Sequence, residues 1–294
     1  MDRTFRRKSV ILMFILPALV LYILLVVVSV FWASWYSFFD WRGVGEMNFV
    51  GLENYKQLLC HDQSFWTVLS NTLIFTIIQI VLQVFGGLFV AVFLTSIHKG
   101  RAGLQTLYYM PVVISSVAIC QIFNKLLSVT PTGVVNSILA GINPDWLYLE
   151  WISNSNVSLY VAAFVEGYKN LGLYMVIFYA ALISVPKELC EAAIIDGATS
   201  FRQFISVKLP HIKPVLLTNC ILVLNGSLRS FDISYLLTKG GPGNSSELLT
   251  TYMYKQAFSS MQYGYGSAVA IVTVVVCLMV GWLFRRLIER RNAE

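Results

Sequence analysis

Long uninterrupted apolar runs dominate the sequence, and shorter segments that gather charged and aromatic residues separate them. An α-helix needs about 20 apolar residues to cross a bilayer. Runs of about this length or longer predict helices at about 10–30, 67–97, 104–123, 157–183, 215–237 and 266–284. A membrane β-barrel would show short segments of alternating polarity instead. The pattern therefore predicts an all-α integral membrane protein with six transmembrane helices.

A basic stretch directly precedes the first apolar run, as it would in a secretory signal peptide. The apolar region of a signal peptide is only about 7–15 residues long and ends in small residues. The run here is longer and leads into Phe31 and Trp32. We therefore expect an uncleaved first helix. The expected organisation is an N-terminal tail (1–9), a six-helix transmembrane domain (10–284) and a basic C-terminal tail (285–294).

Lys and Arg residues are distributed unevenly between the two sets of segments that alternate along the predicted helices. One set holds fourteen of them: Arg3, Arg6, Arg7, Lys8, Lys99, Arg101, Lys187, Arg202, Lys208, Lys213, Arg285, Arg286, Arg290 and Arg291. The other set holds five: Arg42, Lys56, Lys125, Lys239 and Lys255. Cytoplasmic segments carry the excess of basic residues. Both termini are therefore expected on the cytoplasmic side of the membrane.

Composition agrees with a lipid environment, since 57% of the 294 residues are hydrophobic and only 12% are charged. Soluble domains carry about 25% charged residues. A net charge of +6 is compatible with nucleic-acid binding, but no basic cluster lies outside the loops and tails that the positive-inside rule explains. The five cysteines are odd in number and contain no C-x-x-C spacing. We expect no nucleic-acid partner, no disulfide framework and no metal site.

The sequence lacks the short motifs of a nucleotide-binding or catalytic site. It contains no G-x-x-x-x-G-K-[ST], and the glycine-rich turn at 240–243 lacks the lysine and hydroxyl residue of a phosphate-binding loop. H-E-x-x-H and G-x-S-x-G are also absent. A secondary transporter often shows inverted repeats, and no convincing internal repeat is present. We therefore expect no catalytic activity and no cofactor bound by this chain.

The segment 186–214, between the fourth and fifth predicted helices, is too long for a simple connection. Pro186 suits the start of a helix and Gly197 should end it. Ser200 with Gln203 forms a capping-box pattern for a second short helix, and prolines at 210 and 214 should stop that helix. This helix–bend–helix could dock against a partner or rest on the lipid headgroups, and composition alone does not decide between them.

Four charged residues lie inside predicted membrane helices: Glu166, Lys169, Arg229 and Asp232. A lone charge at the bilayer centre costs about 2.5–3.5 kcal/mol on insertion scales. The spacing i, i+3 would let Glu166 pair with Lys169, and Arg229 with Asp232, on single helices. We expect such pairing or a wet cavity, and the sequence does not decide whether these charges act in structure or in transport.

Several segments resemble one known family. Glu191-Ala192-Ala193, followed by Asp196-Gly197-Ala198, a phenylalanine and Leu209-Pro210, resembles the EAA loop of ABC importer permeases. Similar segments occur at 49–55, at 107–111 and at 237–243, where the last resembles the sugar branch of that family, the maltose, glycerol-phosphate and multiple-sugar type. The resemblance covers nearly all of residues 10–290. Val207 stands where isoleucine is usual.

The resemblance implies an importer of a bacterial-type plasma membrane, in which two permeases form the pathway for a sugar or sugar-like solute. Two copies of an ATPase subunit, which bind ATP and Mg, would lie beneath them, and an extracytoplasmic binding protein would deliver the solute. The EAA loop would couple to the ATPase through Glu191, Ala192, Ala193, Asp196, Gly197, Ala198, Leu209 and Pro210. The match to the maltose-type permease places six residues along the substrate pathway: Ser116, Tyr168, Leu171, Gly172, Ser227 and Ser230.

Overall fold

The computed structural model describes residues 8–97 and 99–293, with side chains described for 12–97 and 99–286. Arg3, Arg6 and Arg7 of the expected N-terminal tail lie outside the described residues. Internal contacts divide the chain into two compact units. The first comprises Met1–Asp62 with Met253–Val275, and the second comprises Gln63–Tyr252 with Val276–Glu294.

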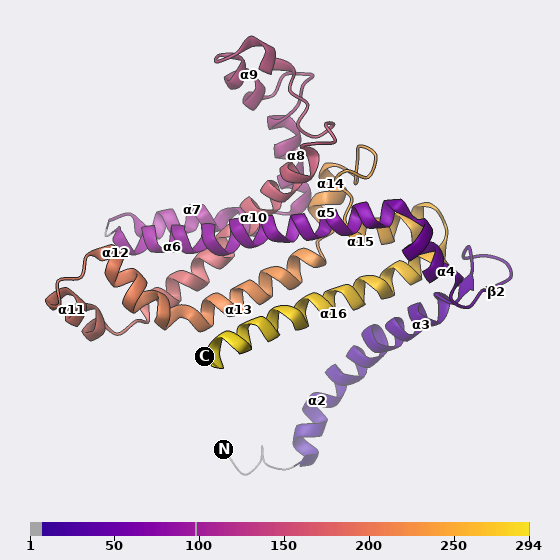
Figure 1. Ribbon diagram of the computed structural model, residues 1–294, viewed down its shortest axis with the longest axis horizontal. Coiled ribbons are helices and arrows are strands. Elements are labelled where there is room, and N and C mark those ends of the chain that lie inside the picture. The colour runs from indigo at the N-terminus through magenta and orange to yellow at the C-terminus, as the bar shows by residue number, and fades with distance from the viewer. Residues whose placement is uncertain (1–7, 98, 294) are drawn as a thin grey trace. The chain divides into compact units, whose positions relative to one another are not determined.

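The first unit begins with one long apolar helix, built from α2 (Lys8–Tyr22), a π-helical turn η1 (Ile23–Val27) and α3 (Val28–Tyr36) (Figure 1). An antiparallel hairpin follows, in which β1 (Phe39–Asp40) pairs with β2 (Asn48–Phe49). The short helices α4 (Glu53–Lys56) and η2 (Gln57–His61) come next. From the later part of the chain, the unit takes η6 (Lys255–Ser259) and the first half of α16 (Tyr263–Ala293).

The second unit is a helical bundle. Its first span joins α5 (Gln63–Gln79), η3 (Ile80–Gly86) and α6 (Gly87–Ser96). After it come α7 (Arg101–Val113), α8 (Ser116–Leu126), α9 (Val134–Ala140), the 3-10 turn η4 (Pro144–Tyr148) and α10 (Ser158–Ile183). The remaining elements are α11 (Lys187–Ile195), α12 (Ser200–Gln203), η5 (Phe204–Lys208), α13 (Leu209–Leu228), α14 (Asp232–Leu237) and α15 (Leu249–Tyr254).

Four helices of the described chain are long and apolar enough to cross a membrane by themselves: Leu12–Tyr36, Gln63–Ser96, Ser200–Leu228 and Tyr263–Arg286. Two bent helix pairs, α7 with α8 and α10 with α11, bring the possible spans to six. The all-α membrane fold is therefore confirmed. The α16 helix also continues past residue 284, where the last span was expected to end.

The third predicted helix, 104–123, is wrong as a continuous element. The chain bends by 100° between α7 and α8, and Ser115 caps the second helix by accepting a hydrogen bond from the backbone N–H of Ala118 at 3.3 Å. A serine hydroxyl competes with helical backbone hydrogen bonds in this way. Pro111 lies one turn earlier and supplies no N–H to α7. An apolar run alone carries no sign of such a break.

The fifth predicted helix, 215–237, is also divided, because α13 ends at Leu228 and α14 starts at Asp232. At the other end, Pro210 and Pro214 do not stop the preceding helix, since Ser200–Leu228 is one continuous span. The π-helical turn η5 ends at Lys208, two residues before Pro210. The regular ladder of helical hydrogen bonds is therefore already interrupted where this proline lacks its N–H. The expected helix stop at these prolines is therefore wrong.

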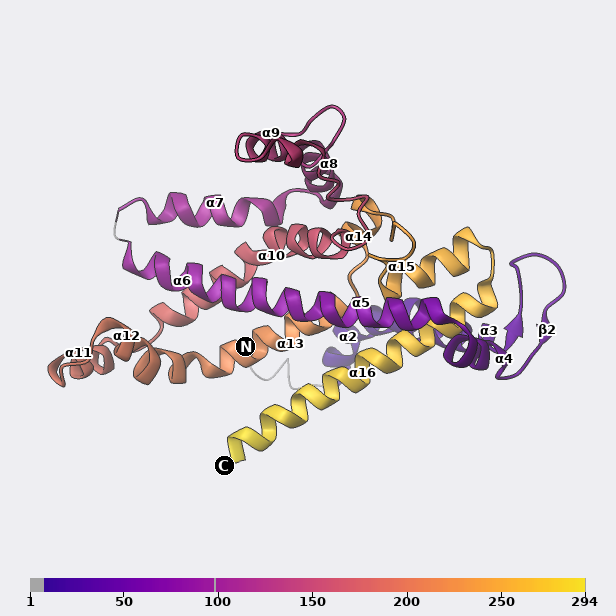
Figure 2. The ribbon, with the colours of Figure 1, turned by 45° about the horizontal axis from the view of Figure 1, so that its top comes forward.

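The core of the second unit forms around α10, which lies against both α6 and α7 (Figures 1 and 2). Met175 and Phe178 are completely buried there. Gly172 allows the closest approach, since an added Cβ would lie 2.8 Å from the Cα of Tyr109 in α7. Small residues permit this kind of backbone contact between membrane helices. The packing fixes α10 as the element on which the polar residues described next are mounted.

Candidate functional site

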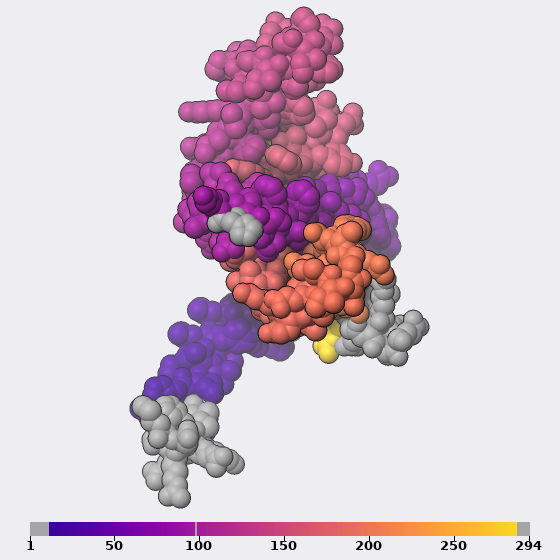
Figure 3. All heavy atoms as spheres, turned by 90° about the vertical axis from the view of Figure 1, so that its left-hand side faces the viewer, coloured from indigo at the N-terminus to yellow at the C-terminus, as the bar shows by residue number. Residues whose placement is uncertain are grey.

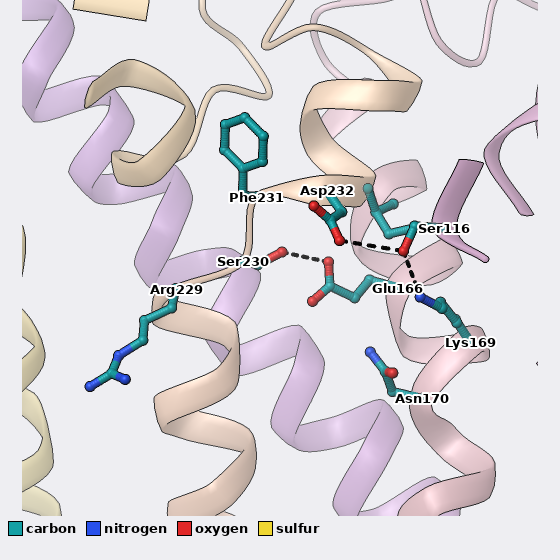
Figure 4. A pocket seen from close by; sticks show the side chains of 9 residues that line it. Ser116, Glu166, Lys169, Asn170, Arg229, Ser230, Phe231 and Asp232 are labelled. Atoms are coloured by element: carbon teal, nitrogen blue, oxygen red, sulfur yellow. Dashed lines mark hydrogen bonds between the residues drawn. The ribbon is translucent and has the colours of Figure 1, made fainter. Parts of the chain in front are cut away.

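A polar pocket of about 230 Å³ lies in the second unit, where α10 meets α8 and the break between α13 and α14. Its polar lining consists of Ser116, Glu166, Lys169, Asn170, Arg229, Ser230 and Asp232. Figure 4 shows these side chains converging from three helices and from the irregular segment 229–231. Polar groups inside a membrane helix are costly, and the pocket brings them together so that they can hydrogen-bond to one another.

Hydroxyl groups connect the charges in this pocket. The ammonium of Lys169 donates a hydrogen bond to Ser116 Oγ at 2.6 Å, and Ser116 Oγ donates to Asp232 Oδ2 at 3.5 Å. Ser230 Oγ donates to Glu166 Oε2 at 2.5 Å. Each serine therefore bridges elements that lie far apart in the sequence (Figure 4).

The i, i+3 ion pairs expected on single helices do not form within the described residues. Asp232 belongs to α14 and Arg229 to the break before it, so helical spacing no longer relates them. The guanidinium of Arg229 is turned away from Asp232 (Figure 4). Glu166 and Lys169 do share a helix, but they hydrogen-bond to Ser230 and Ser116, respectively. The alternative expectation, a polar cavity, describes the arrangement better.

Two of the six expected pathway residues, Ser116 and Ser230, line this pocket. Tyr168 is 45% exposed and packs edge-on against Phe123, with ring centroids 5.7 Å apart. Ser227 is 3% exposed, and its hydroxyl donates to the backbone carbonyl of Leu224 at 3.1 Å.

The remaining two expected pathway residues, Leu171 and Gly172, lie in the contacts of α10 with neighbouring helices. A pathway role for all six residues stays a prediction. Phe231 and Ile233 also line the pocket and were not foreseen, because an apolar residue beside a helix break carries no sequence signal of its own.

The segment 186–214 forms the expected helix–bend–helix, with α11 followed by α12. Gly197 has φ +76°, its N–H donates to the carbonyl of Ile194 at 3.0 Å, and the N–H of Ala198 donates to that of Ala193 at 2.9 Å. These two bonds form a Schellman motif, in which glycine is favoured at the left-handed position. The sequence therefore located the bend correctly.

The helix cap after the bend differs from the expectation. Thr199 caps α12 by accepting from the backbone N–H of Arg202 at 3.3 Å, and Ser200 is the first residue of the helix. Gln203 does not complete a capping box, because its Nε2 donates to the carbonyl of Cys190 at 2.9 Å. This bond ties α12 back to α11. The proposed Ser200–Gln203 capping box is therefore wrong, and the glutamine joins the two short helices.

The surface of this loop is open and mixed in character. Glu191, Ala192, Asp196 and Pro210 are exposed, and Ala193, Ala198 and Leu209 are half-buried. Large apolar side chains are exposed beside them, since Ile195 is 85% and Phe201 75% accessible. Figure 3 shows the α11–α12 segment uncovered on the face turned to the viewer. An exposed apolar patch beside carboxylates is typical of an interaction surface.

The described residues contain no group of three or more His, Cys, Asp and Glu side chains placed to hold a metal ion. The polar pocket and the α11–α12 surface are two candidate sites of the second unit. They lie at opposite ends of one continuous helix, Ser200–Leu228.

Comparison with known proteins assigns the chain to a family. Residues 2–293 match the model described as "Binding-protein-dependent transport system inner membrane component". The chain belongs to this family. The resemblance to ABC importer permeases is thereby confirmed, and the permease is the membrane component of its transporter and not the catalytic one.

Individual relatives match along almost their whole length. The permease is 34% identical to the "Probable ABC transporter permease protein YurN" of Bacillus subtilis, covering 98% of this chain and 99% of YurN. It is 30% identical to the "Probable starch degradation products transport system permease protein AmyD" of Thermoanaerobacterium thermosulfurigenes. The match covers 96% of this chain and 94% of AmyD. The "Multiple sugar-binding transport system permease protein MsmF" of Streptococcus mutans is 31% identical, with 92% of each chain covered.

A solved structure shares the fold. The permease superposes on a chain of a bacterial alginate ABC transporter, crystallised in complex with an alginate pentasaccharide-bound periplasmic protein. The TM-score is 0.85 and the identity is 20%, over 98% of this chain and 96% of that chain. At this identity the similarity establishes the helical architecture alone.

Proposed function

We propose that the permease imports a sugar or sugar-like solute, which an extracytoplasmic binding protein delivers to it. It would form the pathway together with a second permease, and two copies of a separate ATPase would hydrolyse ATP bound with Mg. The names of AmyD and MsmF, which transport starch degradation products and multiple sugars, support the solute class. The charge distribution supports an orientation with both termini and the segment 186–214 in the cytoplasm.

One observation carries the proposal: a single helix separates the two candidate sites. Ser200–Leu228 is 29 residues long and at 1.5 Å per residue spans about 43 Å, which exceeds the roughly 30 Å hydrocarbon core. The α11–α12 surface includes the first turn of this helix, α12, and the polar pocket begins directly after its last residue. A movement imposed on one end by a partner therefore reaches the other end through a continuous element. This arrangement suits a rigid-body switch between two states of the pathway.

The geometry supports specific roles for the loop residues. Ala192 adds little bulk to the exposed face of α11, so another backbone could approach closely. Glu191 offers an exposed carboxylate, and Ile195 offers apolar area that would be buried on docking. The left-handed Gly197 sets the angle between α11 and α12. Together these features would seat the permease on its ATPase.

The decisive experiment is purification of the importer with Glu191→Gln, followed by measurement of the ATPase retained per permease and of uptake into proteoliposomes. Truncating one partner of a partly buried charge pair typically costs 2–5 kcal/mol. We expect the ATPase to dissociate roughly thirtyfold more readily or more, because 1.4 kcal/mol is a factor of ten. Membrane insertion should be unchanged.

Glu188→Gln is the matched control, because Glu188 is exposed in the first turn of the same helix but lies outside the EAA segment. It should retain the ATPase and transport at the wild-type rate. Equal behaviour of the two variants would show that Glu191 makes no specific contact. Absence of any ATPase from the wild-type preparation would remove the proposal altogether.

A further inference from the structure

The polar pocket carries information about the charge of the solute, which the comparisons leave open. AmyD is named for starch degradation products, which are neutral, whereas the solved structure belongs to an importer of alginate, an acidic polysaccharide. We propose that Glu166, Lys169 and Asp232 form a subsite for the hydroxyl groups of an uncharged sugar and discriminate against acidic sugars. This inference rests on the proposed import of a sugar through the pathway that this pocket lines.

The two serines show what kind of group the charges hold. The hydroxyl of Ser116 accepts from Lys169 at 2.6 Å and donates toward Asp232 at 3.5 Å, and the hydroxyl of Ser230 donates to Glu166 at 2.5 Å. A hydroxyl is both a donor and an acceptor, so it satisfies an ammonium and a carboxylate together. A sugar hydroxyl has the same character, and it could replace a serine in either bridge without leaving a charge unpaired.

The pocket offers further hydrogen-bond donors and further hydrogen-bond acceptors. Each carboxylate has a second oxygen that can accept, and the ammonium of Lys169 has three donors, of which one is bound to Ser116. Asn170 adds an amide on the same wall (Figure 4). Several neighbouring hydroxyls of one sugar ring could therefore be bound simultaneously. A cavity of about 230 Å³ with convergent polar groups is typical of a small-molecule site.

The sign of the charges argues against an acidic solute. Glu166 and Asp232 point into the pocket beside Lys169. Arg229 also lines the pocket, but its guanidinium is directed away from the two carboxylates (Figure 4). A sugar carboxylate would lie beside Glu166 and Asp232 and would compete with them for this ammonium. Like-charge contact of this kind suppresses binding of the wrong partner. Recognition of carboxylates more often uses the paired N–H donors of arginine.

The test compares two probes that differ in one group, methyl glucoside and methyl glucuronide. Saturation-transfer NMR on the purified permease–ATPase complex, without the binding protein, measures weak binding to the membrane subunits themselves. We expect the glucoside to bind about tenfold more tightly or better, since hydrogen bonds to charged groups and like-charge contacts each reach this size. Asp232→Asn should narrow the difference between the probes, and Asp232→Asn with Glu166→Gln should narrow it further.

Asp145→Asn is the control, because Asp145 is exposed in η4 and does not line the pocket. It should leave the ratio of the two affinities unchanged. Because the readout is a ratio, a loss of folded complex in one variant does not imitate the expected change. Equal affinities in the wild type, no saturation transfer to either probe, or a ratio that Asp232→Asn does not alter would overturn the inference. Stimulation of the ATPase by the binding protein, measured on the same preparation, reports separately on the proposed function.

Discussion

Gly197 offers the sharpest test of the coupling loop, because its backbone conformation and its surroundings can be separated. Its φ of +76° lies in the left-handed region, and an added Cβ would have no atom of the permease within 4 Å. Alanine at this position therefore meets no steric obstacle within the chain. The cost comes from the backbone alone, about 1–2 kcal/mol for a residue with a Cβ. It would reduce the population of the native bend by roughly five- to thirtyfold.

Three variants distinguish the backbone effect from docking. Gly197→Ala should lower both the ATPase retained on the purified complex and the rate of solute uptake. If the backbone cost is responsible, Gly197→Asn should lower ATPase retention and uptake less than Gly197→Ala does, because asparagine tolerates the left-handed region. If the partner's surface lies against this position, any side chain interferes, and asparagine should be worse than alanine. Gly197→Asp would add a charge to the same interface and should be the most damaging.

Gly100 provides a control with a similar backbone conformation and similarly open surroundings. It precedes α7 with φ +79°, and an added Cβ would also meet nothing within 4 Å. Gly100→Ala therefore carries a similar backbone cost in a different predicted cytoplasmic loop. The reasoning fails if Gly197→Ala keeps the ATPase and transports normally, or if Gly100→Ala causes an equal loss. Either result would show that the bend between α11 and α12 is not the coupling element.

Two further predictions concern topology and packing. In a cysteine-free background, an impermeant thiol reagent added from outside should label a cysteine at Asn244 and not one at Ser200; outside labelling at Ser200 would reverse the proposed orientation. Gly172→Ala should lower the free energy of unfolding of the permease by about 1–3 kcal/mol, because the new methyl group would lie 2.8 Å from the Cα of Tyr109. Unchanged melting of Gly172→Ala in detergent would show that α7 and α10 separate easily.

The membrane spans could be predicted because lipid imposes a minimum apolar length, and the runs beginning near residues 10, 67 and 157 satisfy it. The breaks could not. The bend before Ser116 and the interruption at 229–231 lie inside apolar runs, and a hydropathy pattern does not distinguish a straight helix from a divided one. The prolines led to the opposite error, a predicted helix end where the helix continues, since Pro210 and Pro214 lie within a continuous helix.

The candidate sites were predictable to different degrees for a related reason. Gly197 was identified as the bend because a left-handed residue is a local property of the chain. The pocket depends on contacts between distant segments, such as that of Ser230 with Glu166. Sequence spacing instead suggested a pairing of Arg229 with Asp232, which would need an unbroken helix. The four intramembrane charges were thus recognised, but their actual partners required the fold.

The same helix break would link the proposed specificity of the pocket to the proposed coupling. Because α13 ends at Leu228, Ser230 and Asp232 stand on separate backbone segments, and each bonds to a different element: Ser230 to α10, and Asp232 to α8 through Ser116. A displacement of the helix Ser200–Leu228 would therefore pull on the Ser230–Glu166 bond before it moved Asp232. An unbroken helix would move both residues together and would preserve the pocket. In the proposed importer, the break would let a push at the α11–α12 end change the spacing between the two carboxylates, and with it the affinity for a bound hydroxyl compound.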